Sequence, residues 1–204
     1  MICVLLNDSD FDRTLSPIEF ALEKLGVFYR TWRTFREGFP QYASDCDGLI
    51  ISGGFTMKGY FEEKGDLYGA SFLKNFGKPI LGICLGMQIL ARLAGVSLVV
   101  SRELGISRVW LYEGNDLFKG MKSPLEVCQR HNYALPYVPR GYSVIARNDS
   151  TFIQAIASKD NLKYGVQFHP EEIDLGSEIE SLKIFSNFAS IVERHSTENS
   201  GGGK

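Results

Sequence analysis

The sequence predicts an α/β protein, in which an open and mostly parallel sheet has helices on both faces and is extended by antiparallel strands in its second half. Three observations carry this prediction. Short, wholly apolar segments alternate with helical patterns in the first half, which is typical of buried parallel strands joined by helices. Segments rich in β-formers, separated by turn residues, fill the second half. The length of 204 residues suits one domain with a substantial core.

The first half contains four predicted strands and three predicted helices. The first helix has the clearest start, because Ser16 can cap it, Glu19 completes a capping box, and Gly26 follows its end. Glycines and prolines end the other elements. The predicted strands are residues 2–7, 27–32, 47–54 and 79–84, and the predicted helices are residues 16–26, 67–78 and 85–95.

The second half is predicted to contain further strands and one closing helix. The predicted strands are residues 107–112, 125–130, 142–147, 152–158 and 164–168, followed by an amphipathic helix over residues 177–194. A single domain is therefore expected over residues 1–195. Residues 196–204 are polar and glycine-rich, so we expect them to form a disordered tail outside that domain.

The composition excludes several classes of protein. The formal net charge of −2 argues against a nucleic-acid surface and against a polybasic membrane anchor. No apolar stretch approaches the roughly 18 to 20 residues that span a bilayer, and the first residues predict a strand instead of a signal peptide. The four cysteines are widely spaced. Their spacing argues against a zinc site or a disulfide framework and fits a reducing, cytoplasmic compartment. We expect no metal and no other cofactor.

The segment GICLGMQ (residues 82–88) places Cys84 between two glycines, after an apolar strand and before a helix. This G-x-C-x-G pattern is that of a nucleophile elbow with sulfur in place of oxygen, because a sharp strand-to-helix turn needs small residues where backbones crowd. The start of a helix also favours the thiolate form of a cysteine. On these residues alone, a core cysteine at the end of a strand is the alternative interpretation.

His169 provides the partner that the cysteine needs. It follows the predicted strand at 164–168, so its ring should stand at the carboxyl edge of the sheet, where ligands bind in open α/β folds. Glu171 follows closely and could fix the tautomer of the imidazole, with Glu172 as the alternative. Together with Cys84 these residues would supply a nucleophile, a general base and an orienting acid.

The two other histidines are weaker candidates for a base. His131 is expected in a loop after a strand, where it could line the site. His195 lies at the end of the last predicted helix, where a solvated histidine complements the helix dipole.

An oxyanion hole needs two preorganised donors, usually backbone N–H groups. One should be the N–H of Leu85, directly after the nucleophile. The other should come from the turn at Gly53 and Gly54, which ends a neighbouring apolar strand.

Taken together, the segments ISGGF, PILGICLGMQIL and YGVQFHPEE resemble the class I, triad-type glutamine amidotransferase domain. The resemblance covers roughly residues 1 to 192, with the motifs in the order of the family. The fold expected from it is a flavodoxin-like open sheet. In that family the cysteine attacks the side-chain amide of L-glutamine, forms a γ-glutamyl thioester and releases ammonia.

Carried over by position, the resemblance implies a role for each matched residue. Cys84 would be the nucleophile, His169 the base and acid, and Glu171 the orienting acid, while Gly54 and Leu85 would hold the oxyanion. The residues that match substrate-binding positions are Gln88, Arg130, His131, Asn132 and Tyr133.

The segment LFKGMKSPLEV and the compact size resemble the stand-alone glutaminase subunit of a GMP synthetase. The chain departs from that pattern at Phe55, where the family has proline, and at Tyr133, where it tends to have aspartate. The resemblance implies that ammonia passes to a separate synthetase chain. Two alternatives stay open: a partner-independent hydrolase of γ-glutamyl amides or peptides, and a non-catalytic binding protein. The intact cysteine, histidine and glutamate set argues against the second.

Overall fold

The computed structural model describes residues 1–7, 16–55, 57, 60–62, 65–66 and 68–200. The described strands are β1 (Ile2–Asn7), β2 (Tyr29–Arg33), β3 (Gly48–Gly54), β4 (Phe61–Glu62), β5 (Gly65–Asp66), β6 (Ile80–Ile83), β7 (Val99–Leu111), β8 (Leu125–Ala134), β9 (Tyr142–Arg147), β10 (Ala155–Ser158) and β11 (Lys163–Val166). The described helices are α1 (Pro17–Lys24), α2 (Thr34–Glu37), α3 (Tyr68–Asn75), α4 (Leu85–Leu93) and α5 (Lys183–Ser200), with short 3-10 turns at Ala43–Asp45 and Ile179–Leu182.

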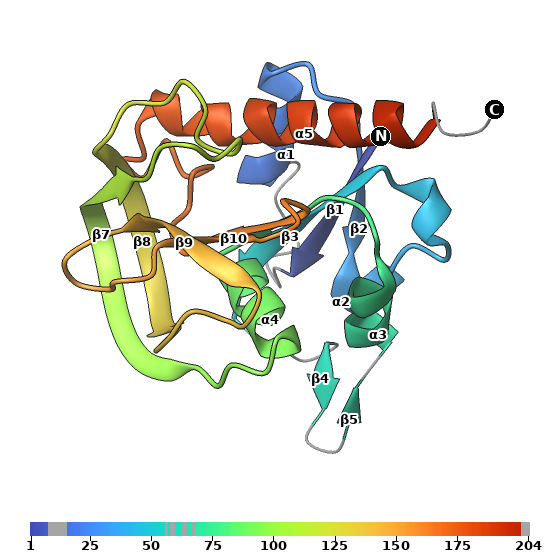
Figure 1. Cartoon of the computed structure of the whole chain (residues 1–204), viewed down its shortest axis with the longest axis horizontal. Coiled ribbons are helices and arrows are strands. Elements are labelled where there is room, and N and C mark those ends of the chain that lie inside the picture. The colour runs from blue at the N-terminus through green and yellow to red at the C-terminus, as the bar shows by residue number, and fades with distance from the viewer. Residues whose placement is uncertain (8–15, 56, 58–59, 63–64, 67, 201–204) are drawn as a thin grey trace.

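A nine-stranded mixed sheet runs through the molecule in the order β2-β1-β3-β6-β11-β10-β9-β7-β8 (Figure 1). The strands from β2 to β11 in this order are parallel neighbours. The strands from β11 onward pair antiparallel. A parallel sheet extended by antiparallel strands is the predicted architecture, which is therefore confirmed. Within the described residues, no helix combines the length and apolar character needed to cross a bilayer.

Both faces of the parallel strands are buried, each by its own set of helices. In β1, Val4 and Leu6 belong to a core cluster shared with α1 and α5, whereas Leu5 belongs to a second cluster shared with α3 and α4. Figure 1 shows α1 and α5 on one side of the sheet and α3 and α4 on the other. This two-sided burial explains why the central parallel strands β1, β3 and β6 are almost wholly apolar, whereas the edge strand β2 carries arginines.

The first helix begins and ends where the sequence predicts. The Ser16 hydroxyl accepts from the Glu19 N–H, and the Glu19 carboxylate accepts from the Ser16 N–H, so the capping box is complete. Gly26 follows with a φ of 66°, a left-handed conformation that glycine adopts without strain. The other oxygen of Glu19 accepts a 2.8 Å hydrogen bond from the Thr31 hydroxyl, so the cap also ties α1 to β2.

The largest difference from the sequence prediction lies in β7 and β8, which form a long hairpin at one end of the sheet (Figure 1). β7 begins at Val99 instead of Ser107, and β8 continues to Ala134 instead of ending at Arg130. His131 therefore lies within a strand, and the prediction that it lies in a loop is wrong. Most side chains in the extended parts are exposed, so no buried stripe marks them in the sequence.

The C-terminal helix is also longer than the sequence predicts. α5 continues to Ser200, so residues 196–200 are helical, and their assignment to a disordered tail is wrong. Residues 201–204 lie outside the described part of the chain. Serine and threonine hydroxyls in this segment donate to backbone carbonyls one turn back, as Thr197 does to Glu193, so these polar side chains find their partners within the helix.

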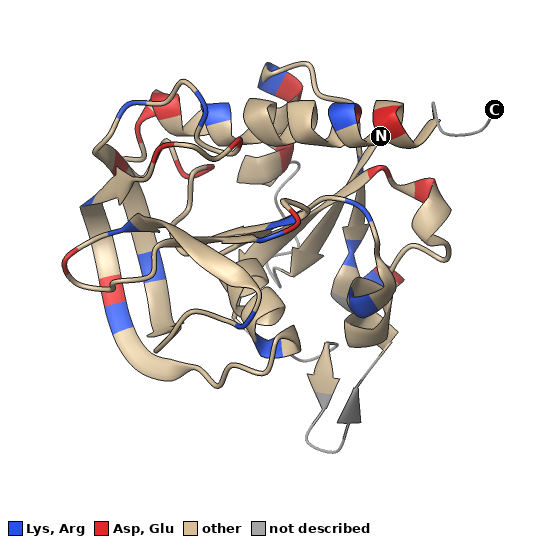
Figure 2. Ribbon diagram, in the orientation of Figure 1, with Lys and Arg blue, Asp and Glu red and all other residues tan. Residues whose placement is uncertain are grey.

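Charged side chains of both signs are interspersed over the helices and the hairpin (Figure 2). Arg108 and Glu126 pair across β7 and β8, and Arg194 of α5 pairs with Asp116. This mixture agrees with the formal net charge of −2.

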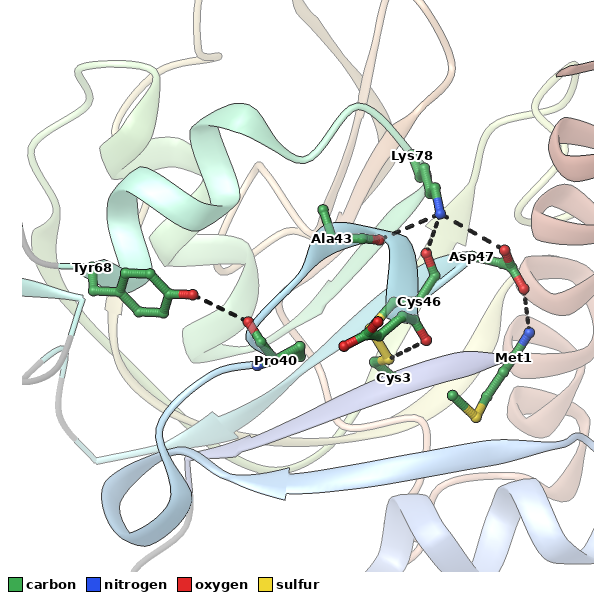
Figure 3. The surroundings of a disulfide bond; sticks show 9 residues. Met1, Cys3, Pro40, Ala43, Cys46, Asp47, Tyr68 and Lys78 are labelled. Atoms are coloured by element: carbon green, nitrogen blue, oxygen red, sulfur yellow. Dashed lines mark hydrogen bonds and ion pairs between the residues drawn. A yellow bond between two sulfur atoms is a disulfide. The ribbon is translucent and has the colours of Figure 1, made fainter.

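The cysteines contradict the sequence prediction. Cys3 in β1 and Cys46, just before β3, form a disulfide with their Cα atoms 5.5 Å apart (Figure 3). Only the parallel pairing of β1 with β3 brings these two residues within bonding range, so their spacing along the chain gave no sign of the bond. Cys84 and Cys128 are free thiols.

Polar contacts surround the disulfide (Figure 3). The Lys78 ammonium donates to the backbone carbonyls of Cys46 and Ala43, and it lies 3.8 Å from the Asp47 carboxylate. The same carboxylate pairs with the N-terminal amine of Met1. These contacts hold the start of β1 against the segment that leads into β3.

Loss of the disulfide should lower the free energy of unfolding by about 2–4 kcal/mol. The physical reason is that the bond joins residues 43 positions apart, so it removes many conformations from the unfolded chain. Urea denaturation with and without reductant measures the effect. The Cys3→Ser/Cys46→Ser double variant is the control, because reductant should not change its stability. Equal stability of the wild-type protein in both conditions would contradict the prediction.

Candidate active site

The carboxyl ends of β1, β3, β6 and β11 lie at one edge of the sheet, and β6 lies between β3 and β11. Gly53 and Gly54 end β3, Cys84 directly follows β6, and His169 lies shortly after β11. Three motifs that are far apart in the sequence therefore meet at this edge, as the sequence predicts.

Cys84 occupies a strained turn between β6 and α4. Its φ of 50° and ψ of −102° lie in a region that residues with a Cβ rarely adopt. Its N–H donates a 2.7 Å hydrogen bond to the carbonyl of Val166, and its carbonyl accepts a 3.1 Å bond from the N–H of Gln88. Both sides of the turn are thus fixed, in the geometry of a nucleophile elbow.

The glycines beside Cys84 are required by close backbone packing. A Cβ on Gly82 would lie 2.4 Å from the carbonyl carbon of Gly86, and a Cβ on Gly86 would lie 2.2 Å from the carbonyl oxygen of Ile51 in β3. Both distances are far inside van der Waals contact. The first turn of α4 can therefore rest on β6 and β3 only where side chains are absent.

His169 and Glu171 form a buried pair, with His169 Nδ1 2.9 Å from Glu171 Oε1. A carboxylate accepts, so Nδ1 carries a hydrogen and Nε2 is left for proton exchange. Within the described residues, Nε2 has no hydrogen-bond partner. Burial lowers the pKa of His169, but the Glu171 carboxylate and the Cys84 sulfur outweigh burial and hold that pKa well above its usual range.

Gly53 lies against both the imidazole and the thiol. A Cβ at this position would lie 2.8 Å from His169 Cε1 and 3.7 Å from Cys84 Cβ. The sulfur itself lies 3.7 Å from Gln167 Nε2 and 3.9 Å from the carbonyl oxygen of Arg130. A carboxylate, an imidazole and a thiol therefore meet in series beside a glycine that leaves room for them.

The backbone of His169 is held by β8. Its N–H donates a 2.9 Å hydrogen bond to the carbonyl of Cys128. The Ser177 hydroxyl donates to the carbonyl of His169 at 2.7 Å and accepts from the N–H of Cys128 at 2.8 Å. Burial raises the pKa of the Cys128 thiol, which keeps this second free cysteine protonated and poorly nucleophilic.

Gly54 and Leu85 lie side by side at the turn. A Cβ on Gly54 would lie 3.1 Å from Leu85 Cδ2 and 2.8 Å from the carbonyl oxygen of Asn7. As the first residue of α4, Leu85 has an N–H without an intrahelical acceptor. Phe55, directly after the glycine pair, is 84% exposed. Beyond Phe55, residues 56–65 lie only partly within the described part of the chain.

Gln88 and β8 approach the thiol from another side. Gln88 Nε2 donates to the carbonyl of Tyr133 at 2.9 Å and to Gln167 Oε1 at 3.3 Å. The Arg130 guanidinium forms a 2.8 Å ion pair with Glu172. Glu172, the alternative orienting acid, is thus paired with an arginine. Glu171 is the carboxylate that bonds the imidazole.

Other predicted residues lie elsewhere. The side chain of Asn132 is exposed. The ring of His131 is buried and contacts Ser101 and Glu103 of β7, not the thiol. His195 lies partly exposed on α5.

Two polar residues of the site were missed in the sequence. Gln167 is fully buried beside the sulfur, and its polar side chain in the apolar segment YGVQF was an available signal. Asn7 donates to the carbonyl of Ser52 at 3.1 Å and accepts from the Tyr60 hydroxyl at 2.8 Å. It thereby holds the ends of β1 and β3 behind the glycine pair, a role that no sequence pattern indicates.

His169, Glu171 and Glu172 offer ligand atoms within 4.8 Å of one another, a spacing that a metal ion could use. The same groups already have protein partners, because Glu171 bonds the imidazole and Glu172 pairs with Arg130. A bound metal would have to replace these contacts. The arrangement suits proton transfer better than metal binding.

Comparisons with known sequences point to one family. The chain matches the family model described as glutamine amidotransferase class-I over residues 12–188. It is 32% identical over 153 residues to one subunit of the glutamine-hydrolyzing GMP synthase of Saccharolobus solfataricus, an alignment that covers 74% of this chain and 78% of that protein. It is 28% identical over 166 residues to the glutamine-hydrolyzing GMP synthase of Vibrio vulnificus, an alignment that covers 80% of this chain but 32% of that longer protein.

Comparisons with solved structures support the fold. A putative GMP synthase subunit from Thermoplasma acidophilum superposes with a TM-score of 0.81 at 24% identity, over 98% of this chain and 96% of that one. A glutamine amidotransferase from Thermotoga maritima gives a TM-score of 0.67 at 20% identity, over 98% and 91% of the two chains. At these identities the likeness shows a shared fold.

The substitution Gly53→Ala should slow alkylation of Cys84 by iodoacetamide about tenfold. The added methyl group would push the His169 ring away from the thiol, which would then lose its stabilising partner. Mass spectrometry of the alkylated peptide against time gives the rate. Gly77→Ala is the matched control, since a Cβ there meets nothing within 4 Å. Equal alkylation rates in the two variants would contradict the assigned packing around Gly53.

Proposed function

This chain belongs to the class-I glutamine amidotransferase family, and from that premise we propose that it hydrolyses L-glutamine to glutamate and ammonia through a γ-glutamyl thioester on Cys84. The observation that carries the proposal is the convergence of a thiol, an imidazole and a carboxylate at the carboxyl edge of the sheet. His169 Nδ1 bonds Glu171 at 2.9 Å, and both the His169 ring and the Cys84 side chain pack against Gly53.

The reaction has two stages. Cys84 Sγ attacks the side-chain amide carbon of glutamine, His169 takes the thiol proton, and the same proton passes to the departing nitrogen, which leaves as ammonia. Water then attacks the thioester carbon and gives a proton to His169. The carbon–sulfur bond breaks, glutamate leaves, and the proton returns to the sulfur. Glu171 keeps Nδ1 protonated, so Nε2 is the nitrogen that exchanges protons throughout.

Both stages pass through a tetrahedral intermediate with a negative oxygen. We assign the stabilisation of this oxygen to the N–H groups of Leu85 and Gly54. Leu85 begins α4, where the N–H groups have no intrahelical acceptors and the helix dipole favours negative charge. Backbone donors fixed before the reaction cost little reorganisation while it occurs.

The amino-acid end of glutamine is proposed to bind between α4 and β8. Gln88 and the segment with Arg130, Asn132 and Tyr133 would contact it. His131 belongs to this segment, but its buried ring points elsewhere, so we propose that it contributes only through its backbone. The Arg130–Glu172 ion pair offers one charge of each sign, which suits an α-carboxylate and an α-ammonium group.

The ammonia is proposed to pass to a separate synthetase chain of the GMP synthase type. Support comes from the relatives that are named as single subunits of glutamine-hydrolyzing GMP synthases, which match over most of their length. Phe55 and Tyr133 are 84% and 50% exposed beside the site, where a partner would meet them. A cytoplasmic location, expected from the sequence, stays a prediction.

Substitution of the triad should separate the three roles. Cys84→Ala should abolish glutamine hydrolysis, and His169→Ala should lower kcat about 10³-fold, because both remove a reacting group. Glu171→Gln should cost less, about 10²-fold, because it removes only the orienting charge. Ammonia release in a coupled assay measures all three. Glu126→Gln, in the exposed Arg108–Glu126 pair away from the site, is the control and should leave kcat near the wild-type value.

The pH dependence of kcat/KM tests the proposed role of Glu171 independently. The Glu171 carboxylate raises the pKa of His169, and His169 must be unprotonated to accept the thiol proton, so removal of this carboxylate should shift the acid limb of kcat/KM to lower pH. Trapping with labelled glutamine should place the adduct on Cys84 and not on Cys128. Normal turnover by Cys84→Ala would overturn the assignment of the nucleophile.

The acceptor can be tested directly. Mixing the chain with an ATP-pyrophosphatase-type GMP synthetase subunit, XMP, ATP and glutamine should yield GMP and raise the rate of glutamine hydrolysis above a low basal value. A complex with the Cys84→Ala chain is the control and should form GMP only when ammonia is added. Rapid hydrolysis of γ-glutamyl peptides by the chain alone, without GMP or stimulation, would instead favour the partner-independent hydrolase.

A further inference from the structure

The β7–β8 hairpin carries a second buried acid–imidazole pair, which the proposed reaction does not use. His131 Nε2 lies 3.4 Å from Glu103 Oε2, and the two side chains are only 1% and 10% exposed. His131 follows Arg130 in β8, so their side chains project to opposite faces of the strand. The carbonyl of Arg130 contacts the Cys84 sulfur. The pair and the active site are thus joined by one strand.

The hydrogen-bond partners define the charge on this pair. His131 Nδ1 lies 3.0 Å from the carbonyl oxygen of Ser101, which can only accept, so Nδ1 carries a hydrogen. Glu103 Oε1 accepts from Asn148 at 2.6 Å, and Glu103 Oε2 accepts from Gln154 at 3.2 Å. Both oxygens therefore act as acceptors, as in an ionised carboxylate.

A charge pair with Glu103 requires the second nitrogen of His131 to carry a hydrogen as well. Without it, the Nε2 lone pair would face the Glu103 carboxylate across 3.4 Å inside the protein. Burial raises the pKa of Glu103, but the nearby His131 ring and the hydrogen bond from Asn148 outweigh burial and leave that pKa below its ordinary value.

Amide side chains connect the pair to the thiol. Gln154, which donates to Glu103, accepts from Gln129 of β8 at 2.9 Å. The backbone carbonyl of Gln154 accepts from the N–H of Gln167 at 2.8 Å, and the Gln167 side chain lies 3.7 Å from the Cys84 sulfur. A continuous set of hydrogen bonds therefore runs from the charge pair to the active site.

We propose that Glu103 and His131 are positioning residues for glutamine hydrolysis, whose charge pair fixes β8 so that its carbonyl groups stand against the active site. The proposal rests on the proposed function. One of these carbonyls, that of Tyr133, holds the Gln88 side chain at 2.9 Å. Neither member of the pair touches the substrate.

The expected effect of breaking the pair follows from its burial. Removal of one charge leaves the other buried and uncompensated, which is strongly unfavourable and forces β8 to shift. β8 and Gln88 are proposed to hold the amino-acid end of glutamine, whereas the side chains of the triad come from outside this strand, which bonds His169 through the backbone alone, at Cys128. The loss should therefore appear mainly in KM.

Glu103→Gln keeps the shape of the side chain and removes its charge. In steady-state kinetics at a temperature where every variant is folded, its KM for glutamine should rise about tenfold while kcat changes less than about threefold. Glu126→Gln is the matched control, because it breaks the exposed Arg108–Glu126 pair in the same hairpin and should change neither constant. The Glu103→Gln/His131→Gln double variant should recover part of the loss, since neutral amides replace both charges.

Nitrogen-15 NMR of the histidine rings supplies a readout that does not depend on glutamine. Both ring nitrogens of His131 should be protonated in the wild-type protein at neutral pH, and only one in Glu103→Gln. A neutral His131 in the wild type, or an unchanged KM in folded Glu103→Gln, would overturn the proposal. If the wild-type protein does not hydrolyse glutamine, the proposed function fails and the positioning role with it, while the spectrum still decides the charge of the pair.

Discussion

The active site depends on one close contact, that of the first turn of α4 with the strands beneath it. Gly86 rests on the Ile51 carbonyl of β3, and Gly82 in β6 lies under the same turn. Side chains normally separate a helix from the sheet that it covers. Here the backbones meet, so the chain must turn sharply between β6 and α4, and Cys84 takes a positive φ at that point. The position of the thiol above the sheet edge is a consequence of this packing.

The second group, the imidazole, is fixed in a different way. His169 lies beyond the end of β11, and its backbone is bonded to Cys128 of β8. β8 thus serves the site in three places, since it also supplies the carbonyls beside Cys84 and Gln88. The parallel half of the sheet supplies the proposed nucleophile and the glycine turn, and the antiparallel half holds the proposed general base and the wall of the proposed substrate site. The predicted extension by antiparallel strands is therefore part of the proposed catalytic apparatus.

Much of this could be predicted because the relevant signals are local. Wholly apolar strands indicate a sheet that is buried on both faces. Gly53, Cys84 and His169 each lie at or just after the end of a predicted strand, which indicates that they lie at the same edge of the sheet. The long hairpin could not be predicted, because exposed strands need no apolar stripe and are specified by pairing. The orientation of His131 follows from the register of β8, and one residue more or less reverses it. The disulfide depends on contacts between segments far apart in the chain. The spacing of the cysteines along the sequence does not indicate such contacts.

The place of β6 in the sheet bears on how the chain is made. β6 lies between β3 and β11, and Ile83 pairs with Val166. During synthesis, β6 leaves the ribosome long before β11, so an apolar strand presents an unpaired edge to the cell for that whole interval. The thiol of Cys84 is present from the start of this interval, yet it has no imidazole beside it. A nascent chain of this protein is thus open to aggregation through β6 before it can carry out any chemistry. When β11 is made, it pairs with the free edge of β6, and the residues that follow it bring His169 to the thiol.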